Sequence, residues 1–266
     1  MNDITQDEES RLYINSLARG LQLLTAFTED RPEMKLGDLA PAAGMTKSAA
    51  QRFAFTLVAL GYLHKNEATK VYSLAPRSLE IGLRYLQTSA LVKSANPYVH
   101  ALNRACGETC IVAELDGHDV VYIARFPAHR EMFVNMPIGM RLPVYCTATG
   151  RAILSQLPEA TAASLIDACE RVPYTSETIT DPATLKALLV EARERGFAWA
   201  NGEYYNGDIN IAAAILAPNG KPIGAVNVSA PSTRWTLHSA IAEIGPQVLE
   251  TARAIGAANL SRRTGS

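Results

Sequence analysis

The chain has 266 residues, which is enough for two domains of ordinary size. Hydrophobic residues make up 48% of it and charged residues 19%, the balance of a folded protein rather than a disordered one. Its charge-free stretches are too short and too polar to span a membrane, and its acidic N-terminus is unlike a secretory signal. We therefore expect a cytoplasmic protein that binds no membrane.

The formal net charge of −1 argues against nucleic acid for the chain as a whole, but not for its N-terminal part. Residues 11–75 hold eight lysines and arginines against five acidic residues, a local net charge of +3. A basic excess of this kind is what a DNA-binding face needs. The four cysteines form no C-x-x-C pair, and we expect neither a metal nor a cofactor.

The first predicted elements are a flexible tail over residues 1–11 and an amphipathic helix over 12–28. The apolar residues of this helix should pack on the two helices that follow, and they are Leu17, Leu21, Leu24 and Phe27. Residues 29–32 end the helix, and residues 36–44 predict a short second helix that closes on a glycine. Its length and turn suit the first helix of a helix-turn-helix.

The helix that follows is the centre of this region, with Thr46 as its expected N-cap and Gly61 at its end. One side carries an apolar stripe, formed by Ala50, Phe53, Ala54, Leu57 and Leu60. The other side is polar and basic over the first two turns, with Lys47, Ser48, Gln51 and Arg52. A helix that is polar at its N-terminal half and buried beyond it has the anatomy of a DNA-recognition helix. A solvated surface helix would show the same pattern.

A β-hairpin is predicted next, from alternating segments at 62–65 and 70–74 around a polar turn. It would form the wing of a winged helix, with Lys65 and Lys70 near its tip, where phosphates would lie. The predicted DNA-binding domain thus spans 12–75, and a linker helix that Pro76 opens follows over 76–89. Helix, turn, helix and wing in this order are a more specific signal than any one of them.

The remaining residues, 90–260, predict a domain of mixed helices and strands. Pro97 starts or kinks a helix that runs to Gly107, and an Asp116-Gly117 turn joins the first two strands. The predicted strands cover 109–115, 119–126, 131–136, 209–216 and 222–230. The predicted helices cover 147–157, 159–170, 182–195 and 236–260, the last interrupted by Gly245-Pro246. We expect an α+β fold, an antiparallel sheet with helices on one face.

An ordered set of motifs runs through nearly the whole chain. The N-terminal ones lie at 16–21, 52–53, 57–62 and 72–82, and the later ones at 138–143, 147–152, 195–197 and 223–231. Together they resemble the IclR family of bacterial transcription regulators. The resemblance implies a winged helix-turn-helix that binds a palindromic operator in double-stranded DNA at the nucleoid. It also implies a GAF-like effector-binding domain behind the linker helix, and a homodimer or tetramer.

Within the family, the segments at 141–145 and 207–214 look most like regulators of protocatechuate and 4-hydroxybenzoate breakdown. This subgroup implies a small carboxylate effector, either an aromatic acid or a derivative of one, and a short keto acid is the alternative. Many members carry a longer acidic stretch before the late strand, some with a cysteine in it, where this chain has Asn210. The effector of better-known members is therefore not carried over.

Two sites are expected. The expected DNA-binding residues are Arg19, Thr46, Lys47, Ser48, Gln51, Arg52, Lys65 and Lys70. The expected effector-binding residues, placed by motif position, are Val134, Leu142, Ala148, Thr149, Asp208, Asn210, Asn227 and Ser229, with Arg125 as a carboxylate clamp. Each has a structural alternative: Thr149 could cap its helix, the two asparagines could bond strand neighbours, and Arg125 could be solvated at a strand end.

Enzyme motifs are missing from the sequence. It has no nucleophile elbow, Walker loop, dinucleotide fingerprint or zinc-protease motif, and its five histidines are scattered. We expect no enzyme and no catalytic residues. A winged-helix module that binds protein instead of DNA is the alternative from another class. Lys47, Gln51 and Arg52 on one helix face speak against it, and a gel shift separates the two.

Overall fold

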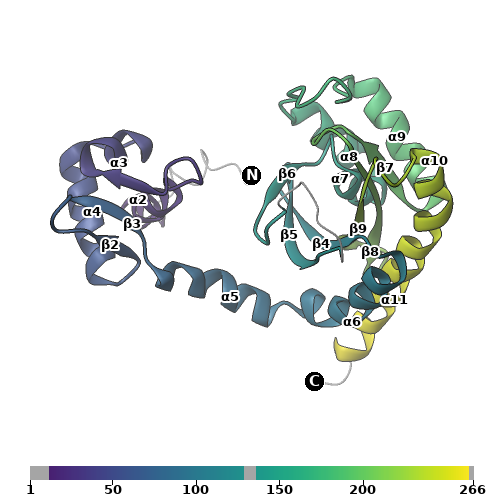
Figure 1. Ribbon diagram of the computed structural model, residues 1–266, viewed down its shortest axis with the longest axis horizontal. Coiled ribbons are helices and arrows are strands. Elements are labelled where there is room, and N and C mark those ends of the chain that lie inside the picture. The colour runs from purple at the N-terminus through teal and green to yellow at the C-terminus, as the bar shows by residue number, and fades with distance from the viewer. Residues whose placement is uncertain (1–11, 129–135, 264–266) are drawn as a thin grey trace. The chain divides into compact units, whose positions relative to one another are not determined.

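The computed structural model describes residues 12–128 and 136–263, which form two compact units that divide between Leu86 and Gln87 (Figure 1). Each unit has a core of its own. None of the helices in these ranges is long and apolar enough to cross a membrane. The predicted domain boundaries at 75–76 and 89–90 stay predictions, since a helix crosses the division between the units.

The N-terminal unit is a small helical domain with a short sheet. Its elements are α2 (Asn15–Thr25), β1 (Glu33–Lys35), α3 (Leu36–Ala42), α4 (Lys47–Ala59), β2 (Leu63–Lys65) and β3 (Val71–Leu74). Its antiparallel sheet has the order β1-β3-β2, so the predicted hairpin is confirmed and β1 is an addition to it. Three residues are too short to show the alternation that marks a strand, which is why the sequence did not reveal β1.

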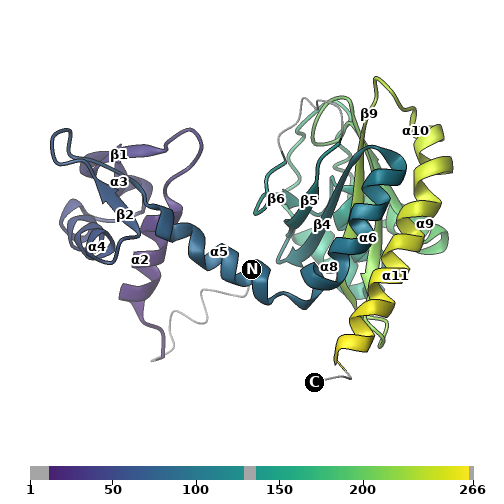
Figure 2. The same ribbon diagram turned by 60° about the horizontal axis from the view of Figure 1, so that its bottom comes forward.

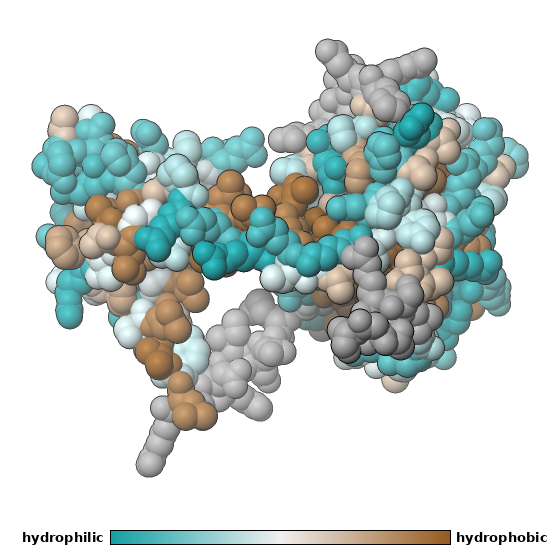
Figure 3. Space-filling view, turned by 90° about the horizontal axis from the view of Figure 1, so that it is seen from below, coloured by the Kyte–Doolittle hydropathy of each residue, from teal (hydrophilic) through white to brown (hydrophobic). Residues whose placement is uncertain are grey.

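The core of this unit lies between the helices and the sheet, and its buried residues include Leu23, Leu39, Ala50, Ala54, Leu63 and Tyr72. The predicted helix over 12–28 is shorter, since α2 ends at Thr25, and the expectation that its four apolar residues pack inward is wrong for two of them, because Leu17 is 61% exposed and Leu21 51%. Leu60, the last of the predicted stripe on α4, is also 50% exposed. Figure 3 shows apolar side chains on the surface of this unit. The unit therefore leaves apolar surface uncovered by its own residues.

A connecting helix follows the sheet. A 3₁₀ turn, η1 (Pro76–Ser78), precedes α5 (Leu79–Thr88), so Pro76 opens this segment as predicted. No residue of α5 is buried, and its apolar residues Leu79, Ile81 and Leu83 are exposed.

The C-terminal unit is built around one curled antiparallel sheet with the strand order β6-β5-β4-β9-β8-β7 among the described residues (Figure 1). The strands are β4 (Thr109–Asp116), β5 (Asp119–Phe126), β6 (Arg141–Pro143), β7 (Ala198–Asn201), β8 (Asp208–Leu216) and β9 (Pro222–Pro231). The four long strands match the prediction. The short edge strands β6 and β7 were not predicted, and residues 131–135 of the expected third strand lie outside the described residues; Met136 is in no strand.

Helices cover both faces of this sheet, so the expectation of one covered face is wrong. They are α6 (Ala90–Cys106), α7 (Ala148–Ser155), α8 (Glu159–Ala168), α9 (Pro182–Arg195), α10 (Leu237–Ser239), the π-helical turn η2 (Ala240–Ile244) and α11 (Gly245–Arg263). Figures 1 and 2 show α6 and α11 side by side on one face, and the residues of α7 pack into the core on the other. A sheet buried on both faces explains why β8 and β9 are apolar along most of their length.

The start of one proline-containing helix differs from the prediction, whereas the predicted Gly245-Pro246 interruption of the last helix is confirmed. The α6 helix begins at Ala90, where the Ser89 hydroxyl accepts a hydrogen bond from the Val92 N–H, so Pro97 lies inside the helix. The Gly-Pro interruption is the point where the π turn ends and α11 begins. A Cβ on Gly245 would lie 2.5 Å from Cζ of Phe197, so only glycine fits beneath that ring.

Candidate nucleic-acid interface and effector pocket

The α4 helix has the two-sided character expected of it. The Thr46 hydroxyl accepts a hydrogen bond from the Ala49 N–H at 3.3 Å, which confirms Thr46 as the N-cap. Ala50, Ala54 and Leu57 are buried on one side. The helix ends at Ala59, and Gly61 then adopts the left-handed conformation that favours glycine, with φ +78°.

A groove of about 620 Å³ separates the exposed side of α4 from the β2–β3 hairpin. Four of the eight predicted DNA-binding residues line it: Ser48, Gln51, Arg52 and Lys65. The other four, Arg19, Thr46, Lys47 and Lys70, are exposed but do not line the groove. The structure thus brings the first three turns of α4 and the wing together on one polar, partly basic surface.

An acidic residue lies between the two wing lysines. The Nζ of Lys65 is 2.8 Å from Oε1 of Glu67, and the Nζ of Lys70 is 2.9 Å from Oε2 of the same residue. These hydrogen bonds lower the pKa of Glu67 to about 2, and the one from Lys65 has the larger effect. Glu67 is therefore charged at neutral pH. The lysines do lie near the wing tip, as predicted, but no pattern in the sequence indicated that one carboxylate holds both of them.

The effector pocket predicted for the C-terminal unit contains a chain of hydrogen bonds on the face of the sheet that packs against α7. Asn227 donates to Oδ1 of Asn210 at 2.9 Å, and Asn210 donates to Oδ2 of Asp208 at 2.8 Å. The Ser229 hydroxyl donates to Oδ1 of Asp208 at 2.6 Å. Every second residue of β8 and β9 lies on this face, which is why 208, 210, 227 and 229 come together. The two asparagines thus bond their strand neighbours.

Asp208 is the buried end of this chain and is only 5% exposed. Burial raises its pKa, and the hydrogen bonds from Ser229 and Asn210 lower it to a smaller extent. The resulting group is ready to hold a proton or to accept a further hydrogen bond from a hydroxyl. Oδ1 of Asn227 is also buried and has no hydrogen-bond partner among the described residues.

The N-terminus of α7 lies against this polar face. Thr147, not Thr149, is the N-cap, since its hydroxyl accepts from the Gly150 N–H at 3.1 Å. A Cβ on Gly150 would lie 2.3 Å from the Val144 carbonyl oxygen, so glycine is required where the helix start packs on that segment. Thr149 is buried beside the pocket. It does not cap the helix, which was the structural alternative to a role in effector binding.

A small pocket of about 20 Å³ lies where these elements meet. Five predicted residues line it: Leu142, Ala148, Thr149, Asp208 and Asn210. Asn227 and Ser229 lie behind this lining through their hydrogen bonds, and Val134 is outside the described residues. The sequence missed the rest of the lining, which is Tyr122, Met136, Cys146, Thr147, Ala200, Glu203, Tyr204 and Tyr205. Two of them carried a signal: strand alternation places Tyr122 on the same face as Val120, and Thr147 opens the motif at 147–152.

Arg125 does not line the pocket. It lies on β5 in register with Ile111 of β4, which in turn pairs with Asn227 of β9. Its Nε is buried and has no hydrogen-bond partner among the described residues. A buried guanidinium nitrogen of this kind is suited to an anion, so the clamp role of Arg125 stays a prediction.

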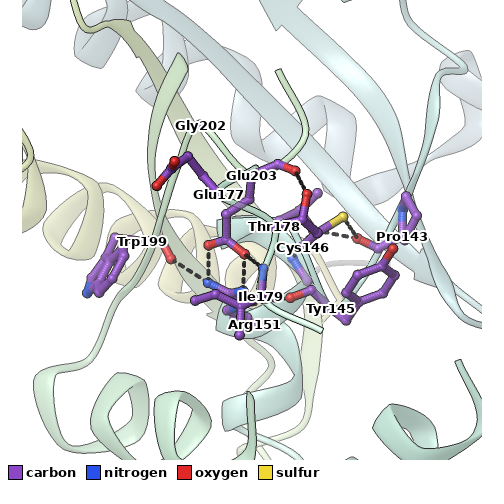
Figure 4. Close-up of polar contacts among 12 residues, drawn as sticks. Pro143, Tyr145, Cys146, Arg151, Glu177, Thr178, Ile179, Trp199, Gly202 and Glu203 are labelled. Atoms are coloured by element: carbon purple, nitrogen blue, oxygen red, sulfur yellow. Dashed lines mark hydrogen bonds and ion pairs between the residues drawn. The ribbon is translucent and has the colours of Figure 1, made fainter. Parts of the chain in front are cut away.

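A buried ion pair supports one wall of the pocket (Figure 4). Arg151 of α7 donates to both carboxylate oxygens of Glu203, at 2.6 and 2.5 Å, and to the carbonyl oxygens of Tyr145 and Trp199. The Ile179 N–H donates to the same carboxylate at 3.3 Å. The pair thereby ties the pocket loop, residues 202–207, which carries Glu203, to α7. It also ties this loop to the segment that contains Ile179.

These groups are suited to bind and orient a small polar ligand. Within residues 12–128 and 136–263, no cluster of three or more histidine, cysteine, aspartate or glutamate side chains is placed to hold a metal ion. The geometry is that of a buried polar site beside a helix N-terminus, together with a separate helix-and-wing surface.

Comparison with known proteins identifies this arrangement. The IclR helix-turn-helix domain matches residues 16–67, and the C-terminal region of the bacterial transcriptional regulator IclR matches residues 83–257. The chain belongs to the IclR family. Members of this family are transcription regulators rather than enzymes, and a helix-turn-helix followed by an antiparallel sheet domain is the fold expected above.

Several IclR proteins are similar over most of their length. The Pca regulon regulatory protein of Pseudomonas putida is 32% identical over 84% of this chain and 77% of its own. The p-hydroxybenzoate hydroxylase transcriptional activator of Acinetobacter baylyi is 32% identical over 90% of each chain. The crystal structure of an IclR homologue of Microbacterium hydrocarbonoxydans complexed with 4-hydroxybenzoate superposes with a TM-score of 0.76 over 92% of this chain and 99% of that one. At 24% identity, that likeness concerns the fold.

Proposed function

We propose that this IclR regulator binds a palindromic operator through α4 and the wing, and that a small hydroxylated aromatic carboxylate controls this binding. The observation that carries the proposal is the Asp208-Asn210-Asn227 chain of hydrogen bonds beside the N-terminus of α7. Two relatives named as regulators of the Pca regulon and of p-hydroxybenzoate hydroxylase support the class of ligand. Such a regulator works in the bacterial cytoplasm, at the nucleoid.

The ligand chemistry follows from the two ends of the pocket. The first N–H groups of a helix have no partner within it, so those of α7 suit a carboxylate. At the other end, Asp208 suits a ligand hydroxyl, which would donate to it. Leu142, Met136 and Tyr122 supply an apolar wall for a ring between the two. A second carboxylate next to Asp208 would be repelled in this buried setting.

The size of the pocket bears on the choice between ligands. About 20 Å³ is room for a single water molecule, so an aromatic acid requires the lining to open. A short keto acid needs less rearrangement, and this observation favours it as the second candidate. Tyr204 and Tyr205, whose ring centroids lie 4.8 Å apart, belong to a loop in the lining and are the groups we expect to move.

Assembly is the third part of the proposal. One winged helix covers only a few base pairs, and a two-fold pair doubles the site and makes it palindromic. The exposed apolar residues of α2 and α5 offer surface for a homodimer or tetramer, with Leu17, Leu21, Leu79 and Leu83 among them. Sedimentation of the full chain with and without DNA tests this, and a strict monomer in both cases contradicts it.

A thermal-shift screen separates the ligand candidates. The ligands are benzoate, 4-hydroxybenzoate, 4-hydroxybenzamide and short keto acids, each with the wild type and with Asp208→Asn. We expect 4-hydroxybenzoate to stabilise the wild type more than benzoate does, and Asp208→Asn to remove that preference. Asp167→Asn, on the exposed face of α8, is the matched control. Stabilisation by keto acids alone would overturn the aromatic assignment.

A further inference from the structure

Phe55 is an unusual residue for its position on α4. It lies four residues after Gln51, three after Arg52 and seven after Ser48, so it shares their face of the helix. The side chain is 75% exposed, whereas Ala54 and Leu57 on the opposite face are buried. An amphipathic helix places polar residues at such a position, and a phenyl ring there exposes apolar surface that its own unit does not cover.

The surroundings of Phe55 indicate what covers it. It lines the same groove as Arg52 and Lys65, whose positive charges attract a polyanion. An apolar ring among cations and amide groups fits the major groove of DNA, which offers phosphates at its edges and base edges at its floor. The only apolar group on those base edges is the C5-methyl of thymine.

We propose that Phe55 reads thymine by contact of its ring with the C5-methyl group in the major groove. The inference rests on the proposed DNA binding through α4, and it names a residue outside the predicted set. The contact removes apolar surface of both partners from water, whereas cytosine has only a hydrogen at C5 and offers less apolar surface there. Phe55 thus adds selectivity for thymine to the hydrogen bonds available to Gln51 and Arg52.

The test removes the methyl group and the ring separately. An operator duplex is selected in vitro with the wild-type protein, and each thymine is then replaced by deoxyuridine, which keeps every hydrogen-bonding group and lacks only the methyl. We expect the wild type to lose about 4-fold or more in affinity at one thymine of each half-site. Phe55→Ala should lose a similar factor on the thymine duplex and bind the thymine and deoxyuridine duplexes equally well.

Controls keep the outcomes distinct. Phe55 is exposed, so Phe55→Ala should keep the wild-type melting temperature, and Val190→Ala is a matched truncation of an exposed apolar residue on α9. Val190→Ala should retain the full methyl dependence. The inference is overturned if the affinity of Phe55→Ala for DNA depends on the thymine methyl group as strongly as that of the wild type. It is also overturned if the only effect of Phe55→Ala is a change in oligomeric state. If the wild type selects no duplex at all, the proposed DNA binding fails instead.

Discussion

Arg151 and Glu203 form a two-pronged ion pair in the interior of the C-terminal unit, with side chains only 1% and 2% exposed. The guanidinium donates to both carboxylate oxygens and has two further carbonyl acceptors, so each of its three nitrogens has a hydrogen-bond partner. Glu203 also lines the pocket and accepts from the Ile179 N–H. One ion pair thus fixes the start of the pocket loop against α7.

Breaking this pair should destabilise the protein strongly, because Glu203→Gln leaves a buried guanidinium without its counter-charge. We expect the free energy of unfolding to fall by about 3–5 kcal/mol in urea titrations. The double variant Arg151→Met with Glu203→Leu should recover much of that loss, since neither charge is then buried. Asp167→Asn, which removes an exposed ion pair with Lys186, should cost about 0–1 kcal/mol. A loss in Glu203→Gln as small as this would contradict the role given to the pair.

The wing carboxylate should weaken DNA binding. Glu67 holds Lys65 and Lys70, so a phosphate that binds either lysine competes with it. Glu67→Gln should therefore raise affinity for any duplex by about 2- to 10-fold and steepen the dependence of log K on log salt. Fluorescence anisotropy at several salt concentrations measures both quantities. Glu80→Gln on α5, which breaks an exposed pair with Arg84, should change neither. Equal affinity and slope in wild type and Glu67→Gln would show that the wing lysines do not contact phosphates.

Asp208 should make stability depend on pH in a defined direction. Burial raises its pKa in the folded state above that of the unfolded chain, so the folded protein keeps this proton to higher pH. Between the two pKa values its contribution to stability falls as the pH rises. Asp208→Asn removes this contribution. The stability of the variant relative to that of the wild type should therefore increase as the pH rises from about 4. Urea unfolding over a pH series measures the difference, and a difference that stays constant with pH would contradict the assignment.

Cys106 should be the most reactive thiol of the chain. The hydrogen bond with Cys110, whose Sγ is 3.8 Å away, lowers the pKa of Cys106 to about 7, whereas burial raises that of Cys146 to about 12. Because the thiolate is the reactive form, iodoacetamide should modify Cys106 first, with a rate that is half-maximal near pH 7. Cys110→Ala should move this profile to higher pH. Peptide mass mapping reports the site, and modification of Cys146 first in the folded protein would contradict the prediction.

Local patterns revealed much of this fold before the structure. The two faces of α4, its Thr46 cap and the Asp116-Gly117 hairpin each depend on residues within a few positions of one another. The edge strands β6 and β7 are too short for such a pattern. Pairings across the chain left no local trace either, as for Arg151 and Glu203, 52 residues apart.

The candidate site was predictable to a similar degree. Motif positions placed Asp208, Asn210 and Ser229 in the candidate site together with the start of α7, and alternation along β8 and β9 explains why the structure has these three residues on one face. The loop residues Tyr204 and Tyr205 reach the pocket through the path of their loop, which no periodicity describes. The capping role expected as the alternative for Thr149 belongs to Thr147, because the helix begins at Ala148 and Thr149 therefore lies within its first turn.

Ligand-controlled operator binding is tested most directly by titrating the protein into labelled DNA from its own upstream region, with and without 4-hydroxybenzoate, at physiological salt. We predict an affinity about 10³-fold or more above that for random duplex, and a shift of about 5- to 150-fold when the ligand is added. Equal affinity for both duplexes, or an affinity that neither aromatic acids nor short keto acids change, would contradict the account.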